Sequence, residues 1–274
     1  MKNKYTIKEL LDNTYDIKNV YKNFKDYFTK DDIKYAIDKD YDIDNLVKYV
    51  NDKFDSEMIK YIIKKYKEDE YINDNDYGEW LFKFLKKNFK NKIDKEIIKY
   101  LISEDIYILD ILELGGDKFD KELIKIIINK YYDDSGNSGD YEAEFIIKKL
   151  KDKFDKELIK YAIDKKYDLD DLYFYLRNKF DKELIKYSID KEVDLDDLYG
   201  WVNNNFDKEL IKYAIDKKIE LGSLYCFLKN KFDKELIKYA IDKKADLESL
   251  YEYLGDKFDD ELKQLYRKKR YYKK

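Results

Sequence analysis

The sequence contains no histidine, a single cysteine and no apolar run long enough to span a membrane. Without histidine, the commonest general acid–base catalyst is absent, and neither a Cys–His nor a Ser–His pair can form. Cys226 alone excludes an intramolecular disulfide and is typical of a reducing compartment. The first residues also lack the apolar stretch of a signal peptide. We therefore expect an intracellular, cytoplasmic protein that does not enter a membrane.

Chemistry-bearing motifs are equally scarce. The sequence has no glycine-rich phosphate loop, and no metal-ligand spacing stands out. Aspartate and glutamate are abundant, but they recur with a repeat, as helix caps and surface charges would. We expect no catalytic residue, no cofactor and no metal. A hydrolase that uses paired carboxylates and a metal is the less favoured alternative.

A 26-residue repeat is the strongest feature that is present. The octet Phe-Asp-Lys-Glu-Leu-Ile-Lys-Tyr begins at Phe154, Phe180, Phe206 and Phe232. Looser copies begin at Phe28, Phe54, Ile93, Phe119 and Phe258, with a faint one at Lys2. A period in this range indicates an array of small structural units. With 43% charged and 44% hydrophobic residues, the chain is predicted to fold and to expose a large charged surface.

Residues 154–179 show the pattern of one unit. Apolar residues at helical spacing follow Asp155, and a second such run follows Asp168, so both aspartates are predicted helix N-caps. One two-helix hairpin buries too little apolar surface to be stable alone, and its wide apolar arc must contact both neighbours. The sequence therefore predicts an all-α fold, an elongated α-solenoid that is right-handed or ankyrin-like, with about ten two-helix repeats. Counting the copies gives ten first helices and nine second helices.

The ends of the array are predicted to be polar. In the last copy, Lys263 and Arg267 occupy positions that are isoleucine elsewhere, and Glu9 replaces the usual tyrosine in the first. Terminal repeats need such a face because nothing covers them. We therefore predict one helical-repeat domain, residues 1–266, with units that start near 2, 28, 54, 93, 119, 154, 180, 206, 232 and 258, followed by a basic tail, residues 267–274.

The segment Asp-Lys-Glu-Leu-Ile-Lys-Tyr-Ala-Ile-Asp-Lys-Lys-Ala-Asp-Leu, residues 233–247, resembles the outer helix and exit of ankyrin repeats. Ankyrin units are about 33 residues long and carry a Thr-Pro-Leu-His signature, whereas this chain has shorter units and no proline or histidine. The resemblance implies protein–protein recognition and brings no catalytic residue.

Two units are longer than the others and supply the first set of candidate binding residues. The unit from Phe54 has 39 residues and the unit from Phe119 has 35, and both additions fall between the two helices of a hairpin. Insertions at equivalent places often carry a binding site, although tolerated loop growth is an alternative. The second insertion also has partial EF-hand spacing through Asp133, Ser135, Asn137 and Glu144, but Ser138 stands where that loop needs glycine. The candidate partner-binding residues of the insertions are Glu68, Asp69, Glu70, Tyr71, Asp74, Asp76, Tyr77, Asp133, Asp134 and Asp140.

The second set lies on the second helices, where three positions that point away from the apolar arc vary between copies. Variation on a constant scaffold suits recognition, although exposed positions also drift freely. Beside them runs an aromatic position, either an anchor for a partner or a contact between repeats. The candidates here are Phe174, Arg177, Trp201, Asn203, Phe227, Lys229 and Tyr253. The repeated tyrosines of the first helices are predicted core residues whose hydroxyls reach water, with base stacking as an alternative.

Charge favours one function class over another. The tail has six basic residues in eight, and taking its +6 from the net −4 leaves −10 for residues 1–266. An acidic body repels phosphate, so modular binding of single-stranded RNA is the alternative hypothesis. We predict a non-enzymatic protein–protein interaction module with an acidic surface that binds a protein partner with a basic surface. The Lys, Asp, Tyr, Ile and Asn bias suggests an AT-rich genome, so one form of this hypothesis is a viral or phage inhibitor of a host defence factor.

Overall fold

The computed structural model describes residues 5–67, 74–131 and 140–271 and is all-helical, without a β-strand in these ranges. This confirms the predicted all-α class. The chain divides into two compact units, Met1–Phe119 and Asp120–Lys274. Within the described ranges the two units contain ten first helices, which carry odd numbers, and nine second helices, which carry even numbers, as the repeat predicted.

The first unit contains four two-helix hairpins. Its helices are α1 (Ile7–Asp12), α2 (Ile17–Phe24), α3 (Lys30–Asp38), α4 (Ile43–Val50), α5 (Ser56–Lys67), α6 (Asp74–Phe89), α7 (Lys95–Ser103) and α8 (Ile108–Gly115). The second unit contains five hairpins and a closing helix. Its helices are α9 (Lys121–Lys130), α10 (Asp140–Leu150), α11 (Lys156–Asp164), α12 (Leu169–Leu176), α13 (Lys182–Lys191), α14 (Leu195–Trp201), α15 (Lys208–Lys217), α16 (Leu221–Phe227), α17 (Lys234–Asp242), α18 (Leu247–Leu254) and α19 (Asp260–Tyr271).

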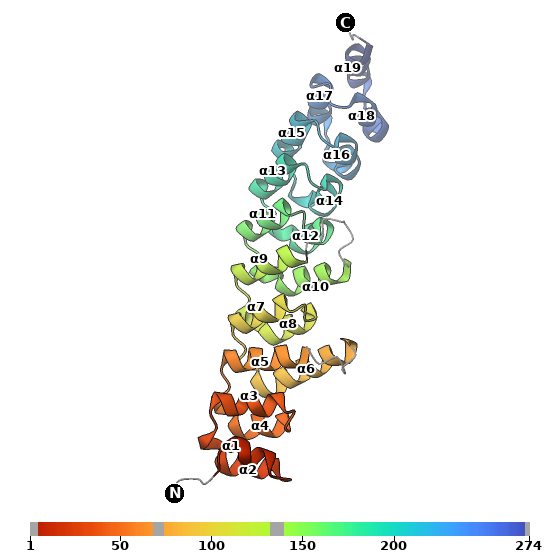
Figure 1. Ribbon diagram of the computed structural model, residues 1–274. Helices are drawn as coiled ribbons and strands as arrows, with labels where there is room; N and C mark the ends of the chain where they lie inside the picture. The colour runs from red at the N-terminus through yellow and green to blue at the C-terminus, as the bar shows by residue number, and fades with distance from the viewer. Residues whose placement is uncertain (1–4, 68–73, 132–139, 272–274) are drawn as a thin grey trace. The chain divides into compact units, whose positions relative to one another are not determined.

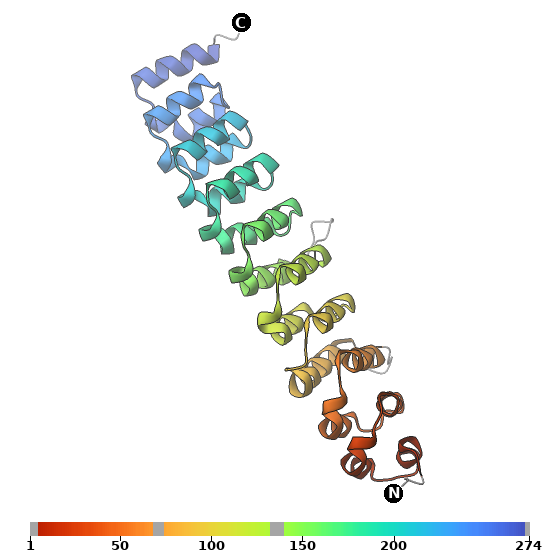
Figure 2. The ribbon, with the colours of Figure 1, turned by 90° about the vertical axis from the view of Figure 1, so that its left-hand side faces the viewer.

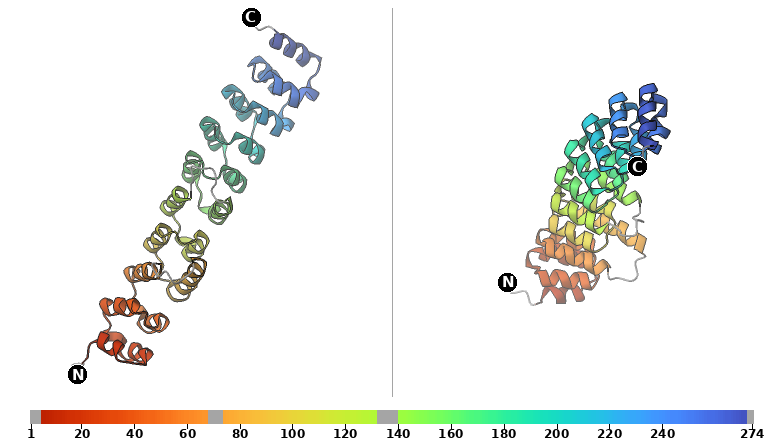
Figure 3. Two further views of the ribbon diagram at one scale, coloured as in Figure 1. Left: turned by 45° about the vertical axis from the view of Figure 1, so that its right-hand side comes forward. Right: turned by 90° about the horizontal axis from the view of Figure 1, so that it is seen from above.

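Helices of the same kind pack side by side within each unit. In the second unit α9, α11, α13, α15, α17 and α19 follow one another in contact, and so do α10, α12, α14, α16 and α18 (Figure 1). In the first unit α1, α3, α5 and α7 form the same sequence of contacts, while α2 packs on α4 and α6 on α8. Figures 2 and 3 show these paired helices from other sides. Each unit is thus a stack of hairpins with a row of first helices and a row of second helices.

The first helix of each hairpin is set by the octet. In α11, the Asp155 side chain accepts a hydrogen bond from the backbone N–H of Leu158 at 3.0 Å, which confirms the predicted N-cap. Leu158, Ile159 and Ala162 are fully buried, because the apolar face meets the first helices of both neighbouring hairpins. The small side chain at the position of Ala162 allows that close approach.

The turn between α11 and α12 is tight and passes through the left-handed region of backbone conformation. After α11, Lys166 has φ of 53°, its N–H bonds to the Ile163 carbonyl at 2.9 Å, and the Tyr167 N–H bonds to the Ala162 carbonyl at 2.9 Å. This is a Schellman ending, which usually has glycine at the left-handed position. The N-cap of the second helix, Asp168, also has a positive φ, 34°. The sequence places no glycine at either position, so the turn holds ordinary side chains in a strained conformation.

In the described residues a 3-10 turn follows every second helix except α6 and joins it to the next hairpin, an element that the sequence analysis did not predict. In the second unit, the Lys179 ammonium donates to the carbonyls of Lys151 and Phe154, both at 2.7 Å, and so ties neighbouring hairpins together. Lys231 makes an equivalent bond to the Phe206 carbonyl at 2.7 Å. These turns are η1 (Lys25–Tyr27), η2 (Asn51–Lys53), η3 (Gly116–Lys118), η4 (Lys151–Lys153), η5 (Arg177–Lys179), η6 (Asn203–Asn205), η7 (Lys229–Lys231) and η8 (Gly255–Lys257).

The closing helix α19 has the polar outer face that its sequence predicted. Leu262 and Tyr266 are buried, whereas Lys263 is half-exposed and Arg267 is exposed. The predicted basic tail begins inside this helix, because α19 continues to Tyr271. Two interactions explain this extension. The basic residues 267–270 interact favourably with the negative end of the helix dipole, and Lys269 forms an ion pair with Asp242 at 3.1 Å.

Candidate protein-binding surface

In the second unit, charged side chains of each first helix form ion pairs with those of the next first helix. The Lys156 ammonium pairs with the carboxylates of Asp181 and Glu183, and Lys160 pairs with Glu183 at 2.5 Å. The same contacts recur one repeat later, where Lys182 bonds Asp207 at 2.5 Å and Glu209 at 3.1 Å. The cap aspartate, the glutamate and the two lysines of the octet therefore form one continuous ladder of ion pairs between hairpins.

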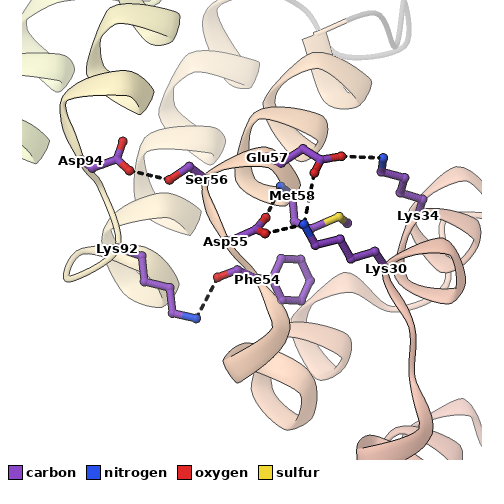
Figure 4. A network of polar contacts seen from close by, with 9 residues as sticks. All are labelled: Lys30, Lys34, Phe54, Asp55, Ser56, Glu57, Met58, Lys92 and Asp94. Carbon is purple, nitrogen blue, oxygen red and sulfur yellow. Dashed lines mark hydrogen bonds and ion pairs between the residues drawn. The ribbon is translucent and has the colours of Figure 1, made fainter.

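The first unit contains the same ladder. Lys30 pairs with Asp55 at 2.5 Å and with Glu57 at 3.1 Å, while Lys34 pairs with Glu57 at 2.9 Å (Figure 4). Hydrogen bonds from Lys34 and Lys30 lower the pKa of Glu57. Hydrogen bonds with Asp55 and Glu57 raise the pKa of Lys30. These groups consequently remain charged and paired over the neutral pH range.

The tyrosines of the first helices continue this pattern. The Tyr187 hydroxyl donates to Asp164 of the preceding hairpin at 2.7 Å, and Lys191 pairs with the same carboxylate at 2.5 Å. Tyr213 donates to Asp190 at 2.6 Å. These half-buried tyrosines therefore each bind a carboxylate of the neighbouring hairpin through a hydroxyl that lies in exposed surroundings, a contact that the sequence analysis did not predict.

The second helices of the second unit have a different character. We define the acidic row as α12, α14, α16 and α18, whose sequences LDDLYFYL, LDDLYGW, LGSLYCF and LESLYEYL contain no basic residue. Asp196, Glu248 and Glu252 are exposed, and within residues 140–271 none of the three forms an ion pair. Trp201 and Phe227 of the same row are 41% and 49% exposed. The acidic row thus leaves both carboxylates and aromatic rings open.

Burial also raises the pKa of two carboxyl groups in the first turns of α12 and α14. Asp171 lies one helical turn after the cap residue Asp168, and partial burial together with the Asp168 carboxylate raises the pKa of Asp171 to about 7. Asp197 stands in the same relation to Asp194, and its pKa is also raised to about 7. In the first unit the equivalent position is Asn45, whose amide donates to Asp42 at 2.7 Å.

Neighbouring second helices meet through an acid and an aromatic residue that are 31 positions apart. The Tyr175 hydroxyl donates to the Glu144 carboxylate at 2.5 Å, and Lys148 lies 5.8 Å from the centre of the Tyr175 ring. One repeat later, the Trp201 indole N–H donates to Asp170. The Trp201 ring also packs edge-on against Phe174, with ring centres 4.8 Å apart.

Of the predicted strip residues, the structure brings three together. Phe174 is half-buried between Trp201 and the guanidinium of Arg177, which lies 5.3 Å from the Phe174 ring centre. The others lie along neighbouring helices and turns. Asn203 and Tyr253 are half-buried, Phe227 faces Gly200, and Lys229 pairs with Asp256 at 3.1 Å.

The structure describes the backbone of some of the predicted insertion residues and does not describe the others. The insertions do fall between α5 and α6 and between α9 and α10. Glu68, Asp69, Glu70, Tyr71, Asp133 and Asp134 lie outside the described residues, as do Ser135, Asn137 and Ser138 of the calcium hypothesis. Asp74, Asp76 and Tyr77 belong to α6 and Asp140 begins α10, but their side chains are outside the description.

Sequence analysis did not pair Asp170 or Asp196 with the aromatic residues of the next hairpin. The signal that could have found these pairs is a spacing of 31 residues between an acidic residue and an aromatic one. This spacing is one 26-residue repeat plus about one and a half helical turns. Glu144 was considered only as a calcium ligand, and the structure shows it as the acceptor for Tyr175.

The fold and this surface define an all-helical repeat protein with one row of internally paired charges and one row of open carboxylates and aromatic rings. Comparisons with protein-family models, curated proteins and solved structures gave no match. Among the described residues, no helix has the length and apolar character needed to cross a membrane.

Proposed function

We propose that the chain is a non-enzymatic protein-binding module whose partner presents a basic surface to the acidic row. One observation carries the proposal. Lysine and acidic side chains of the first helices pair with one another in the ion-pair ladder, whereas Asp196, Glu248 and Glu252 have no cationic partner in the described part of the second unit. Open carboxylates of one sign favour encounter with a cationic partner and disfavour other partners.

The aromatic side chains of the row support the same proposal. Exposed Trp and Tyr side chains are enriched among the residues that contribute most to protein–protein affinity. Trp201 is held by its indole bond to Asp170 and its packing on Phe174, so it loses little side-chain freedom on binding. The resemblance to ankyrin repeats points to the same class of function. One basic surface of this kind is the nucleic-acid channel of a larger enzyme, which an acidic inhibitor encoded by a virus or phage would block in a host defence factor.

Single-stranded RNA is the less supported ligand. The acidic row has no basic residue in its four helices, and carboxylates repel phosphate.

The experiment compares two triple variants of the full chain in affinity capture from host-cell lysate. The test variant is D196N/E248Q/E252Q, and none of the three side chains forms a hydrogen bond or an ion pair within the described residues of the second unit. The matched control is D26N/D52N/D152N, which removes the same charge from exposed aspartates in the 3-10 turns.

We expect a partner that the original chain and the control retain and that the test variant binds about 10-fold more weakly, since exposed charge pairs contribute roughly 0.5 kcal/mol each. Equal retention by both variants, or no retained partner at all, would contradict the proposal. Loss of the captured material on nuclease treatment would favour the RNA alternative.

A further inference from the structure

Three successive junctions of second helices place an aromatic residue 31 positions after an acidic one. In the first two junctions the pair is closed by a hydrogen bond, from Tyr175 to Glu144 and from Trp201 to Asp170. In the third, between α14 and α16, the residues at the same two register positions are Asp196 and Phe227. Phenylalanine has no donor, so it cannot close this junction as tyrosine and tryptophan close the others.

The third junction also lacks the neighbouring side chain that the other two have. Lys148 lies over Tyr175, and Phe174 packs against Trp201, whereas the equivalent residue beside Phe227 is Gly200. A methyl group added to Gly200 would lie 3.6 Å from the Phe227 ring, at ordinary contact distance. Glycine therefore places no side chain on this side of the ring, and Phe227 is 49% exposed.

We propose that the junction of α14 and α16 binds one arginine side chain of the partner, with its guanidinium on the Phe227 ring and paired with the Asp196 carboxylate. This inference rests on the proposed function and names the site and the chemical group that it binds. The acid and the ring stand where each neighbouring junction already joins an acceptor to a donor. The partner's guanidinium supplies the donor that Phe227 lacks.

Arginine fits this site better than lysine. A planar guanidinium can lie on an aromatic face while its N–H groups reach a carboxylate, whereas an ammonium is a compact and strongly hydrated charge. The chain contains its own example of the first contact, because the Arg177 guanidinium lies 5.3 Å from the Phe174 ring centre. The site therefore selects for an arginine-containing segment among basic partners.

The test uses a fluorescein-labelled peptide, acetyl-(Arg-Gly-Gly)3-amide, and measures its affinity for the full chain by fluorescence anisotropy at low salt. The critical variant is Phe227→Tyr, which adds a hydroxyl that can donate to Asp196 as Tyr175 donates to Glu144. The control is Phe145→Tyr, which adds the same hydroxyl to an exposed ring on α10 that is not a member of the three acid–aromatic pairs. Urea unfolding of each variant checks that the fold is retained.

We expect Phe227→Tyr and Asp196→Asn each to weaken peptide binding about 5-fold, because the first occupies the Asp196 carboxylate with a new hydroxyl and the second removes its charge, and an exposed ion pair contributes up to about that factor. Phe145→Tyr should bind the peptide as the original chain does, and a lysine version of the peptide should bind more weakly. Unchanged affinity of Phe227→Tyr, or equal affinity for the lysine peptide, would overturn the inference.

Two further results separate this inference from the proposed function. If the captured partner is lost from the D196N/E248Q/E252Q variant but retained by Phe227→Tyr, the acidic row binds the partner and the arginine site is wrong. If an oligouridine probe competes for the site and its own binding falls in Phe227→Tyr, the ligand is nucleic acid and the inference fails. Self-association that disappears in Phe227→Tyr would likewise overturn it, by assigning the junction to a second copy of the chain.

Discussion

Two tyrosines at equivalent positions of adjacent hairpins should respond oppositely to loss of their hydroxyl. Tyr225 is fully buried and donates to the Ala245 carbonyl at 2.7 Å. Tyr199 is equally buried, but its hydroxyl has no hydrogen-bond partner among the described residues. Replacing each with phenylalanine removes one oxygen from the same place in the repeat.

The expected magnitudes follow from the two environments. Tyr225→Phe removes a buried bond of about 1 kcal/mol and leaves a carbonyl less well satisfied, so the free energy of unfolding should fall by about 1–3 kcal/mol. Tyr199→Phe removes a buried polar group without a partner, so the same quantity should rise by about 1 kcal/mol. The two variants should therefore differ by about 2–4 kcal/mol.

Urea-induced unfolding followed by circular dichroism measures this difference. Both residues lie in the second unit, so one transition reports on both. Tyr173→Phe is a control with a longer bond to the Val193 carbonyl, 3.2 Å, and should be destabilised less than Tyr225→Phe. A loss of stability in Tyr199→Phe equal to that in Tyr225→Phe would refute the reasoning, because the Tyr199 hydroxyl would then have a partner.

Three further substitutions test the turns and caps. Gly115→Ala would place a methyl group 2.4 Å from the Phe119 ring, so urea unfolding should show a loss of about 1–3 kcal/mol. Lys166→Gly should raise the free energy of unfolding by about 0.5–1 kcal/mol, because relief of the left-handed conformation exceeds the added entropy of glycine; a decrease would show that the lysine side chain stabilises the turn. Asp171→Asn tests the raised pKa. A raised carboxyl pKa contributes stability below the unfolded value of about 4 that is lost as the pH rises through 7. The variant should therefore match the original chain near pH 4 and exceed it in stability at pH 8, and parallel profiles would contradict the assignment.

The elements that depend on local sequence could be predicted well. Asp155 caps its helix and Leu158 and Ile159 are buried because neighbouring residues of one helix decide these features. The polar face of the last helix followed from Lys263 and Arg267 for the same reason. A regular repeat then extends one correct hairpin to the whole series of helices.

The features that depend on contacts between hairpins could not be predicted in this way. The Lys179 ammonium binds carbonyls about one repeat earlier, and no periodic pattern within one helix signals this. The turn at Lys166 also escapes prediction, because the usual signal for a left-handed residue is glycine. At the candidate site, Phe227 was identified as an aromatic candidate, but its relation to Asp196 depends on the offset between two packed helices.

The reactivity of Cys226 tests the central claim most directly. This sole cysteine is exposed on α16, beside Phe227, and needs no mutation to report on the acidic row. The measurement is the rate at which a thiol reagent modifies Cys226 in the free chain and in its complex with the captured partner. If the partner covers the acidic row, the rate should fall at least 10-fold in the complex; an unchanged rate in a saturated complex would contradict the account.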